Sequence, residues 1–217
     1  HQRKSYKLRR RLFTGLNYLR LRYGLPIPSF FLASIQSGIR NSFILFDTVR
    51  EITGKQIVTD STKTYQRGID LYMAKPNQTR IILLSRDGRG FIHSNIKRKL
   101  FSIDQSITNW KKIYEKALPM LQKLVQKEHY LKVRYEDLAG ETHNELSRIC
   151  KFLGIGYERQ MIEFSSKVNH ATNGNNMRFL PDPTIHTDDT WKESLSERTL
   201  RIFEERAGAM NKTLGHN

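Results

Sequence analysis

Residues 80–96 read TRIILLSRDGRGFIHSN, and this stretch decides the fold class. Four consecutive apolar residues, 81–84, form the pattern of a short buried strand. Arg86 follows the strand, and the turn at 87–90 leads into a predicted helix that carries Ser94. A guanidinium at the carboxyl end of a strand and a hydroxyl on the next helix can converge on one anion. The alternative is an ordinary strand, turn and helix with surface charges, and this stretch alone leaves both open.

Helical and strand patterns alternate along the rest of the chain. Short strands are predicted at 56–59 and 130–133, beside the strand at 81–84. Helical patterns cover residues 6–22, 30–51, 64–74, 91–99, 107–127, 141–153 and 195–210. This alternation predicts an α/β fold with a parallel sheet flanked by helices. We expect residues 1–217 to form one domain, with a basic helical region at 1–50 and the sheet within 51–217.

The chain carries a large excess of positive charge. Lys and Arg number 37 against 21 Asp and Glu, which gives a net charge of +16 over 217 residues. Such an excess favours polyanionic partners: nucleic acid, a phosphorylated nucleotide, a sulfated glycan or an acidic peptide. Much of it lies within residues 3–22, where a solvated basic helix face is the alternative explanation.

Cys150 is the single cysteine, so an intramolecular disulfide and a cysteine-based metal cluster are both excluded. Its place in an amphipathic helical pattern predicts a buried, small hydrophobic residue. No apolar run reaches the length of a membrane span, and no signal-peptide pattern is present. We expect a cytoplasmic location, or the Golgi lumen if the source is eukaryotic.

Three predicted strands end in polar residues. These ends are residues 60–63, Arg86 with Ser94 on the following helix, and residues 134–137. Because the carboxyl ends of parallel strands meet at one edge of a sheet, we expect these side chains to share one rim. A nucleotide with several phosphates would lie there.

The same residues resemble sulfotransferases that use 3′-phosphoadenosine-5′-phosphosulfate (PAPS). The similarity spans roughly residues 40–215, and its motifs come in the order of that family. They are IVTDSTK at 57–63, RDGRGFIHS at 86–94, LKVRYEDL at 131–138, ICKFLG at 149–154, and 170–179 with Trp191 downstream. The second motif is closest to tyrosylprotein sulfotransferases and related bacterial enzymes.

The resemblance implies a P-loop-like sulfotransferase fold and transfer of a sulfuryl group from PAPS to a hydroxyl, with 3′,5′-ADP (PAP) as product and no metal. It places Arg86 and Ser94 on the 3′-phosphate, with Arg178 as a second cation there. It places Tyr135 near the adenine and Lys63 beside the transferring group, where a fixed cation stabilises developing charge. The acceptor stays open between a glycan, a peptide tyrosine and a small molecule, and the positive charge favours an acidic one.

Two family features have no counterpart in the sequence. The glycine-rich loop that holds the 5′-phosphosulfate should precede residues 57–63, and no Gly-x-x-x-x-Gly-[Lys/Arg]-[Ser/Thr] pattern is present. We expect it upstream of His1; the alternative is a non-catalytic relative that has lost it. Tyr65 stands where the cytosolic branch has a catalytic histidine, and tyrosine is a poor base at neutral pH. A basic polyanion-binding domain is a third interpretation of the chain.

Overall fold

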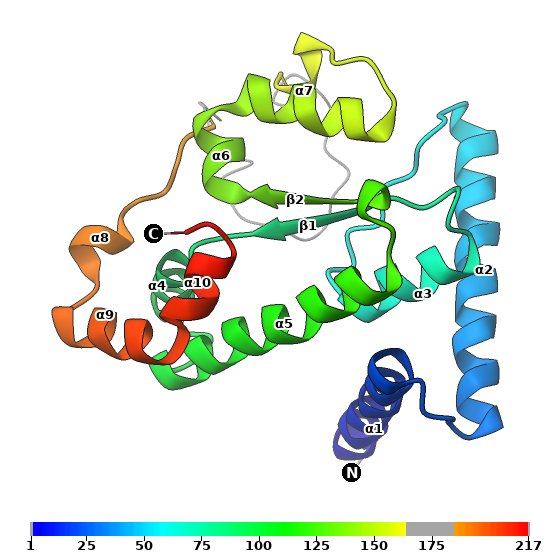
Figure 1. The fold of residues 1–217 in the computed structure, drawn as a ribbon, viewed down its shortest axis with the longest axis horizontal. Helices are drawn as coiled ribbons and strands as arrows, with labels where there is room; N and C mark the ends of the chain where they lie inside the picture. Colours follow the sequence, from blue (N-terminus) through cyan, green and yellow to red (C-terminus); the bar gives the residue numbers. More distant parts are fainter. Residues whose placement is uncertain (1, 164–184, 217) are drawn as a thin grey trace. The chain divides into compact units, whose positions relative to one another are not determined.

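The computed structural model describes residues 2–163 and 185–216, with residues 2–11 described by their helical backbone alone (Figure 1). The chain divides into two compact units. The first combines His1–Ile81 with Ala117–His129, and the second combines Ile82–Lys116 with Tyr130–Asn217. The expected single domain stays a prediction.

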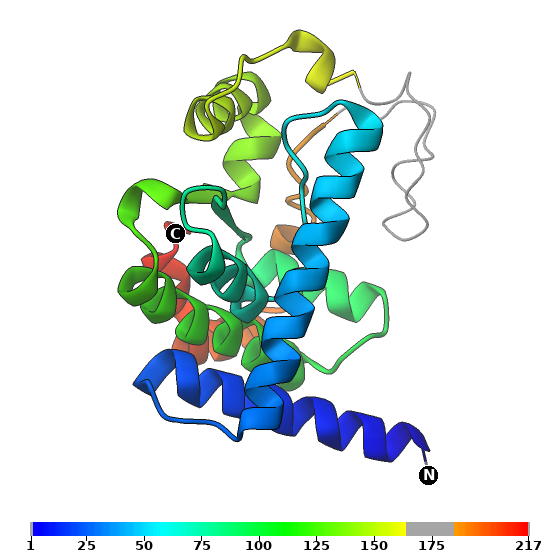
Figure 2. The same cartoon turned by 90° about the vertical axis from the view of Figure 1, so that its right-hand side faces the viewer.

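The first unit is helical. Its elements are α1 (Gln2–Tyr23), α2 (Ser29–Thr53), α3 (Tyr65–Ala74), the carboxyl-terminal part of α5 (Ile103–Leu124) and the short 3-10 turn η1 (Lys127–His129). Figure 2 shows α1 joined by residues 24–28 to the long α2. Helix α2 ends at Gly54, whose φ of 64° is a left-handed conformation that suits glycine.

Polar contacts attach α1 to α3 in this unit. Arg20 forms an ion pair with Asp70, and Asn17 Nδ2 donates to Asp70 Oδ2 at 2.7 Å. Asn17 and Asp70 are buried, so this hydrogen-bonded pairing compensates the desolvation of the carboxylate. Arg20 is therefore engaged inside the unit, although the sequence places it in the basic region.

The second unit contains the sheet. Among the described residues the sheet has two neighbouring strands, β1 (Ile81–Ser85) and β2 (Tyr130–Arg134), which point the same way in Figure 1. Its helical elements are α4 (Gly88–Lys97), the start of α5, α6 (Tyr135–Gly140), α7 (Thr142–Leu153), η2 (Arg159–Met161), α8 (Trp191–Ser194), α9 (Glu197–Phe203), the π-helical η5 (Glu204–Gly208) and α10 (Ala209–Thr213). The α/β class with a parallel sheet is confirmed.

An aromatic cluster fills the core of the second unit. The Trp110 ring lies 5.8 Å from Phe203 and 5.2 Å from Tyr114, measured between centroids. A Cβ at Gly88 would lie 2.5 Å from the Phe203 ring, so only glycine fits where α4 begins. Cys150 is buried on α7, as its helical position predicts.

The structure corrects the sequence analysis at three places. Residues 56–59 were predicted as a strand and are irregular, so that prediction is wrong. The loop that follows is organised by a side chain: Asp60 accepts from the Thr62 amide at 3.0 Å and from Arg67 Nε at 2.8 Å. Helix α5 begins at Ile103 rather than 107, and α6, which was not predicted, begins directly after β2. No helix in the described ranges is long and apolar enough to cross a membrane.

Candidate functional site

Arg86 and Tyr135 meet at the carboxyl ends of the two strands. Arg86 directly follows β1, and its carbonyl oxygen accepts a hydrogen bond from Trp110 Nε1 at 3.1 Å. Tyr135 directly follows β2, and the Arg86 Cζ lies 4.7 Å from the centroid of its ring. This is the geometry of a cation–π contact, which holds the guanidinium in a defined plane. The prediction that these two strand ends share one rim is confirmed for this pair.

The guanidinium also lies against the first turn of α4. A Cβ at Gly90 would lie 3.2 Å from Arg86 Nε and 3.4 Å from Nη2. Ser94 lies four residues further along the same helix, and residues four apart share one face. Arg86 and Ser94 are therefore presented on the same side of α4, one helical turn apart. Two donor groups with this placement suit a phosphate.

Asp188 supplies an anionic partner to Arg86. Its Oδ2 lies 3.1 Å from Arg86 Nη2, and its Oδ1 accepts from Thr190 Oγ1 at 2.6 Å. The Thr190 hydrogen bond, assisted by Arg86, holds the pKa of the Asp188 carboxyl below its usual value, although burial opposes the shift. Asp188 also accepts from the Thr190 amide at 3.4 Å just before α8 begins.

Arg89, the second arginine of the motif, is held by its own helix start. Its Nε donates to Asp87 Oδ1 at 2.9 Å and its Nη2 to Asp87 Oδ2 at 2.5 Å. The Arg89 Cζ lies 4.4 Å from the centroid of the Trp191 ring. Asp87 in turn caps α4 by accepting from the Arg89 amide at 2.8 Å. These contacts fix Trp191 and the start of α4 around Arg86.

Lys63 and Arg178 are the remaining predicted site residues. Lys63 belongs to the first unit, on an exposed loop, and its φ of 60° is uncommon for a residue other than glycine. Thr64 follows it at the N-cap position of α3 and makes no capping hydrogen bond with its side chain. Arg178 and His170 lie outside the described residues. The roles assigned to Lys63 and Arg178 stay predictions.

Tyr65, at the position of the family's histidine, and His93, within the motif at 86–94, could each accept a proton only if their surroundings allow it. Tyr65 is half-buried, and burial together with the nearby Tyr18 raises its pKa to about 12, which makes it a still poorer base at neutral pH. His93 Nδ1 lies 3.4 Å from Thr190 Oγ1, beside the Asp188 loop.

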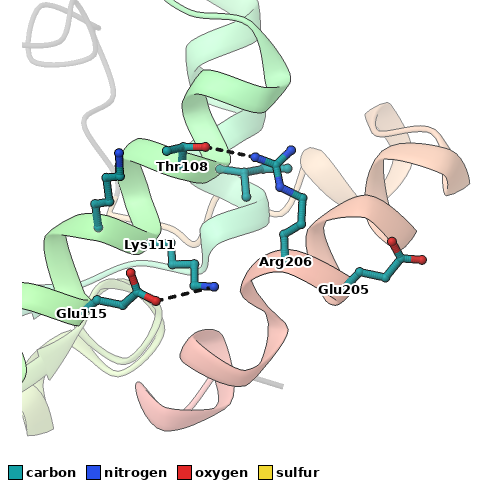
Figure 3. Close-up of a pocket in the computed structure, with 7 residues that line it drawn as sticks. Thr108, Lys111, Glu115, Glu205 and Arg206 are labelled. Carbon is teal, nitrogen blue, oxygen red and sulfur yellow. Dashed lines mark hydrogen bonds and ion pairs between the residues drawn. The ribbon is translucent and has the colours of Figure 1, made fainter.

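A separate hollow of about 330 Å³ lies between α5 and η5 (Figure 3). It is lined by Ile107, Thr108, Lys111, Lys112, Glu115, Glu205 and Arg206. Two of its cations are paired: Lys111 Nζ lies 3.5 Å from Glu115 Oε1, and Arg206 donates to Thr108 Oγ1 at 3.0 Å and pairs with Asp104. Arg86 and Tyr135 do not line it, so we do not assign the nucleotide to this hollow.

Comparison with known proteins assigns the family. The model of the sulfotransferase family matches residues 33–159, which include the Arg86 turn, both strands and α7. The chain belongs to the sulfotransferase family. Two curated relatives, named provisionally as protein-tyrosine sulfotransferases, come from Caenorhabditis briggsae and Caenorhabditis elegans. They are 27% and 25% identical over 142 residues, which is 61% of this chain and 50% and 54% of theirs. The chain therefore spans about half the length of these relatives.

Two solved structures share the fold of this sulfotransferase family member. The sulfotransferase domain of the Synechococcus PCC 7002 olefin synthase superimposes with a TM-score of 0.56 at 19% identity, over 89% of this chain and 74% of that domain. The sulfotransferase domain of the curacin biosynthetic pathway superimposes with a TM-score of 0.52 at 18% identity, over 88% of this chain and 77% of that domain. At these identities the likeness concerns the fold alone.

Proposed function

We propose that Arg86, Ser94 and Tyr135 bind the 3′-phosphoadenosine end of PAPS, and that the full protein is a PAPS-dependent sulfotransferase. One observation carries the proposal: the Arg86 guanidinium is stacked on Tyr135 and lies on the same face of α4 as Ser94. A planar fork of donors beside a hydroxyl fits a phosphate monoester, and the partly buried ring of Tyr135 offers a face on which a purine could stack. Family membership supports the same donor.

The proposed reaction is an in-line displacement at sulfur. The acceptor oxygen forms a bond to sulfur while the bond from sulfur to the 5′-phosphate oxygen breaks, and the acceptor proton passes to a base. PAP is the product. Negative charge develops on the oxygens during transfer, so cations such as Lys63 would lower the barrier by electrostatic stabilisation. Within this chain, Arg86 and Ser94 contribute by holding the nucleotide in place.

We propose a tyrosine in an acidic peptide as the first acceptor to test. The names of the two Caenorhabditis relatives and the net charge of +16 support this choice. A positive surface raises the local concentration of acidic peptides and accelerates their association.

The test is transfer of radiolabelled sulfate from PAPS to two tyrosine peptides by the full-length protein. One peptide has acidic residues around the tyrosine and the other has alanines. We expect faster labelling of the acidic peptide, and at least a tenfold loss in Lys63→Ala because a charge-stabilising cation is removed. Lys55→Ala, on the same exposed stretch, serves as the control and should keep full activity.

Binding and transfer measurements on the same protein distinguish two other functions. A relative that binds nucleotide without catalysis would prefer PAP over ADP and transfer no label. A polyanion-binding domain would bind both nucleotides alike and show a steep salt dependence. Residues 1–46 contain no Asp or Glu, which is the observation that favours the polyanion-binding function.

A further inference from the structure

The end of the chain lies against the turn that carries Arg86. Asn211 is buried on α10, and its Oδ1 accepts a hydrogen bond from the Gly88 amide at 3.0 Å. Its Nδ2 donates to the His216 carbonyl at 3.4 Å and reaches Asp87 Oδ1 at 3.5 Å. Asn211 thus ties the start of α4 to the last described residue of the chain.

His216 contacts the other side of the same turn. Its side chain is 1% exposed, and its Nε2 lies 3.2 Å from the hydroxyl of Ser85, the residue before Arg86. Its Nδ1 lies 3.3 Å from Glu136 Oε2. The other oxygen of Glu136 accepts from the Asp87 amide, the residue after Arg86, at 2.9 Å. His216 therefore bridges groups that hold the backbone on both sides of Arg86.

The imidazole of His216 is neutral or protonated, and its neutral form has one donor and one acceptor nitrogen. The direction of the contact between Nε2 and Ser85 Oγ therefore depends on the tautomer, and the Ser85 hydroxyl also donates to the Val133 carbonyl at 3.5 Å. Burial lowers the pKa of His216, which supports this neutral form, while Glu136 raises the pKa and opposes it. Other charged groups facing the imidazole are Asp87, Asp137 and Arg134.

A hydrolytic role does not fit these residues. Ser85, His216 and Glu136 stand in the order of a serine, histidine and acid triad. However, Ser85 is 4% exposed and His216 is 3% exposed, so a substrate does not reach the hydroxyl. Instead, Glu136 accepts from the Asp87 amide and His216 contacts the side chain of Ser85, and these two residues flank Arg86. The arrangement therefore orients the turn.

We propose that Asn211 and His216 are positioning residues for the 3′-phosphate site. Together they form the C-terminal network, which fixes the turn at 85–88 and hence the direction in which Arg86 projects. Both residues act through Arg86 and do not touch the nucleotide. This inference rests on the proposed function, because it concerns the same phosphate.

The readout is the ratio of the Kd for ADP to the Kd for PAP, measured by calorimetry on the full-length protein. The two nucleotides differ in the 3′-phosphate that Arg86 would bind. His216→Ala and Asn211→Ala should each weaken PAP binding about tenfold, which corresponds to the loss of roughly one hydrogen bond. The affinity for ADP should not change. A purely structural role would weaken both nucleotides together. His143→Ala, at an exposed histidine of the same unit, should change neither.

Milder variants guard against misfolding. His216→Gln and Asn211→Ser keep a hydrogen-bonding group at each position. Their ratio of the Kd for ADP to the Kd for PAP should therefore stay close to that of the wild type. If the wild type prefers PAP and Arg86→Ala loses that preference, while all four C-terminal variants keep the wild-type ratio, the positioning role is wrong and the proposed function stands. If the wild type shows no preference for PAP, the proposed function itself fails.

Discussion

Asp188 Oδ2 lies 3.1 Å from Nη2 of Arg86, so the guanidinium proposed to bind the 3′-phosphate already has an anionic partner. Both side chains are partly exposed, at 27% for Arg86 and 37% for Asp188, and solvent weakens their attraction. A phosphate that approaches Arg86 must share the guanidinium donors with this carboxylate or displace it. Asp188 is thus expected to compete with the nucleotide.

Replacing Asp188 by asparagine should strengthen PAP binding. The change removes a negative charge beside the phosphate but keeps a side chain of similar shape. Because partly exposed ion pairs contribute about 0.2–1 kcal/mol, we expect the affinity for PAP to rise by a factor of roughly 1.4 to 5. Asp189→Asn is the matched control, since Asp189 pairs with Lys192 at 2.7 Å instead. Weaker PAP binding in Asp188→Asn would mean that the carboxylate orients Arg86 rather than competing for it.

Gly90→Ala should reduce the affinity for PAP without reducing the stability of the fold. The Cβ would lie 3.2 Å from Arg86 Nε, so the guanidinium must shift, and PAP binding should fall several-fold. Alanine in a helix is favoured over glycine by up to about 1 kcal/mol, so the thermal midpoint should hold or rise. Gly15→Ala, with open space around its Cβ, should leave affinity unchanged. Unaltered PAP binding in Gly90→Ala would argue against the position assigned to the phosphate.

Gly88→Ala should lower the free energy of unfolding by disturbing the aromatic core. Its Cβ would lie 2.5 Å and 2.6 Å from two atoms of the Phe203 ring, which is itself buried against Trp110. Overpacking of this kind costs about 1–3 kcal/mol, which urea unfolding would measure. The smaller side chain of Phe203→Leu should recover part of that loss in the double variant. Strict additivity of the two single changes would contradict the proposed clash.

Stability should fall in mildly acidic solution because of His216. Burial lowers its pKa from the ordinary 6.5, so below that pH the unfolded chain binds a proton that the folded chain does not. The free energy of unfolding should therefore decrease as the pH falls from about 6.5 toward the lower folded pKa, by at most about 1.4 kcal/mol per pH unit. Above pH 6.5 this contribution is constant. His216→Gln should lack this component, and a slope of opposite sign in the wild type would refute it.

The sheet strands and the Arg86 turn were predictable because their signals are local. The apolar run at 81–84 and the turn after it stand in one continuous stretch, and β1 and α4 formed there. Gly54 and Gly154 likewise end α2 and α7 as the pattern indicates. Burial of Cys150 follows from helical spacing.

The parts that sequence reasoning missed depend on contacts between distant residues. Asp188 meets Arg86 across 102 residues, and His216 meets Ser85 across 131, with no pattern in the chain that links either pair. The strand wrongly predicted at 56–59 has suitable β-branched residues, but propensity alone does not supply a neighbouring strand. In its place Asp60 organises a loop through local hydrogen bonds.

Selectivity for the 3′-phosphate tests the central claim most directly. Calorimetric titrations of the full-length protein with PAP and with ADP would be compared for the wild type, Arg86→Ala and the exposed control Arg198→Ala. We predict tighter binding of PAP by roughly 10- to 100-fold, the value of a charge-assisted hydrogen bond, with the preference lost in Arg86→Ala and kept in Arg198→Ala. Equal binding of the two nucleotides by the wild type, or a preference that survives in Arg86→Ala, would contradict the account.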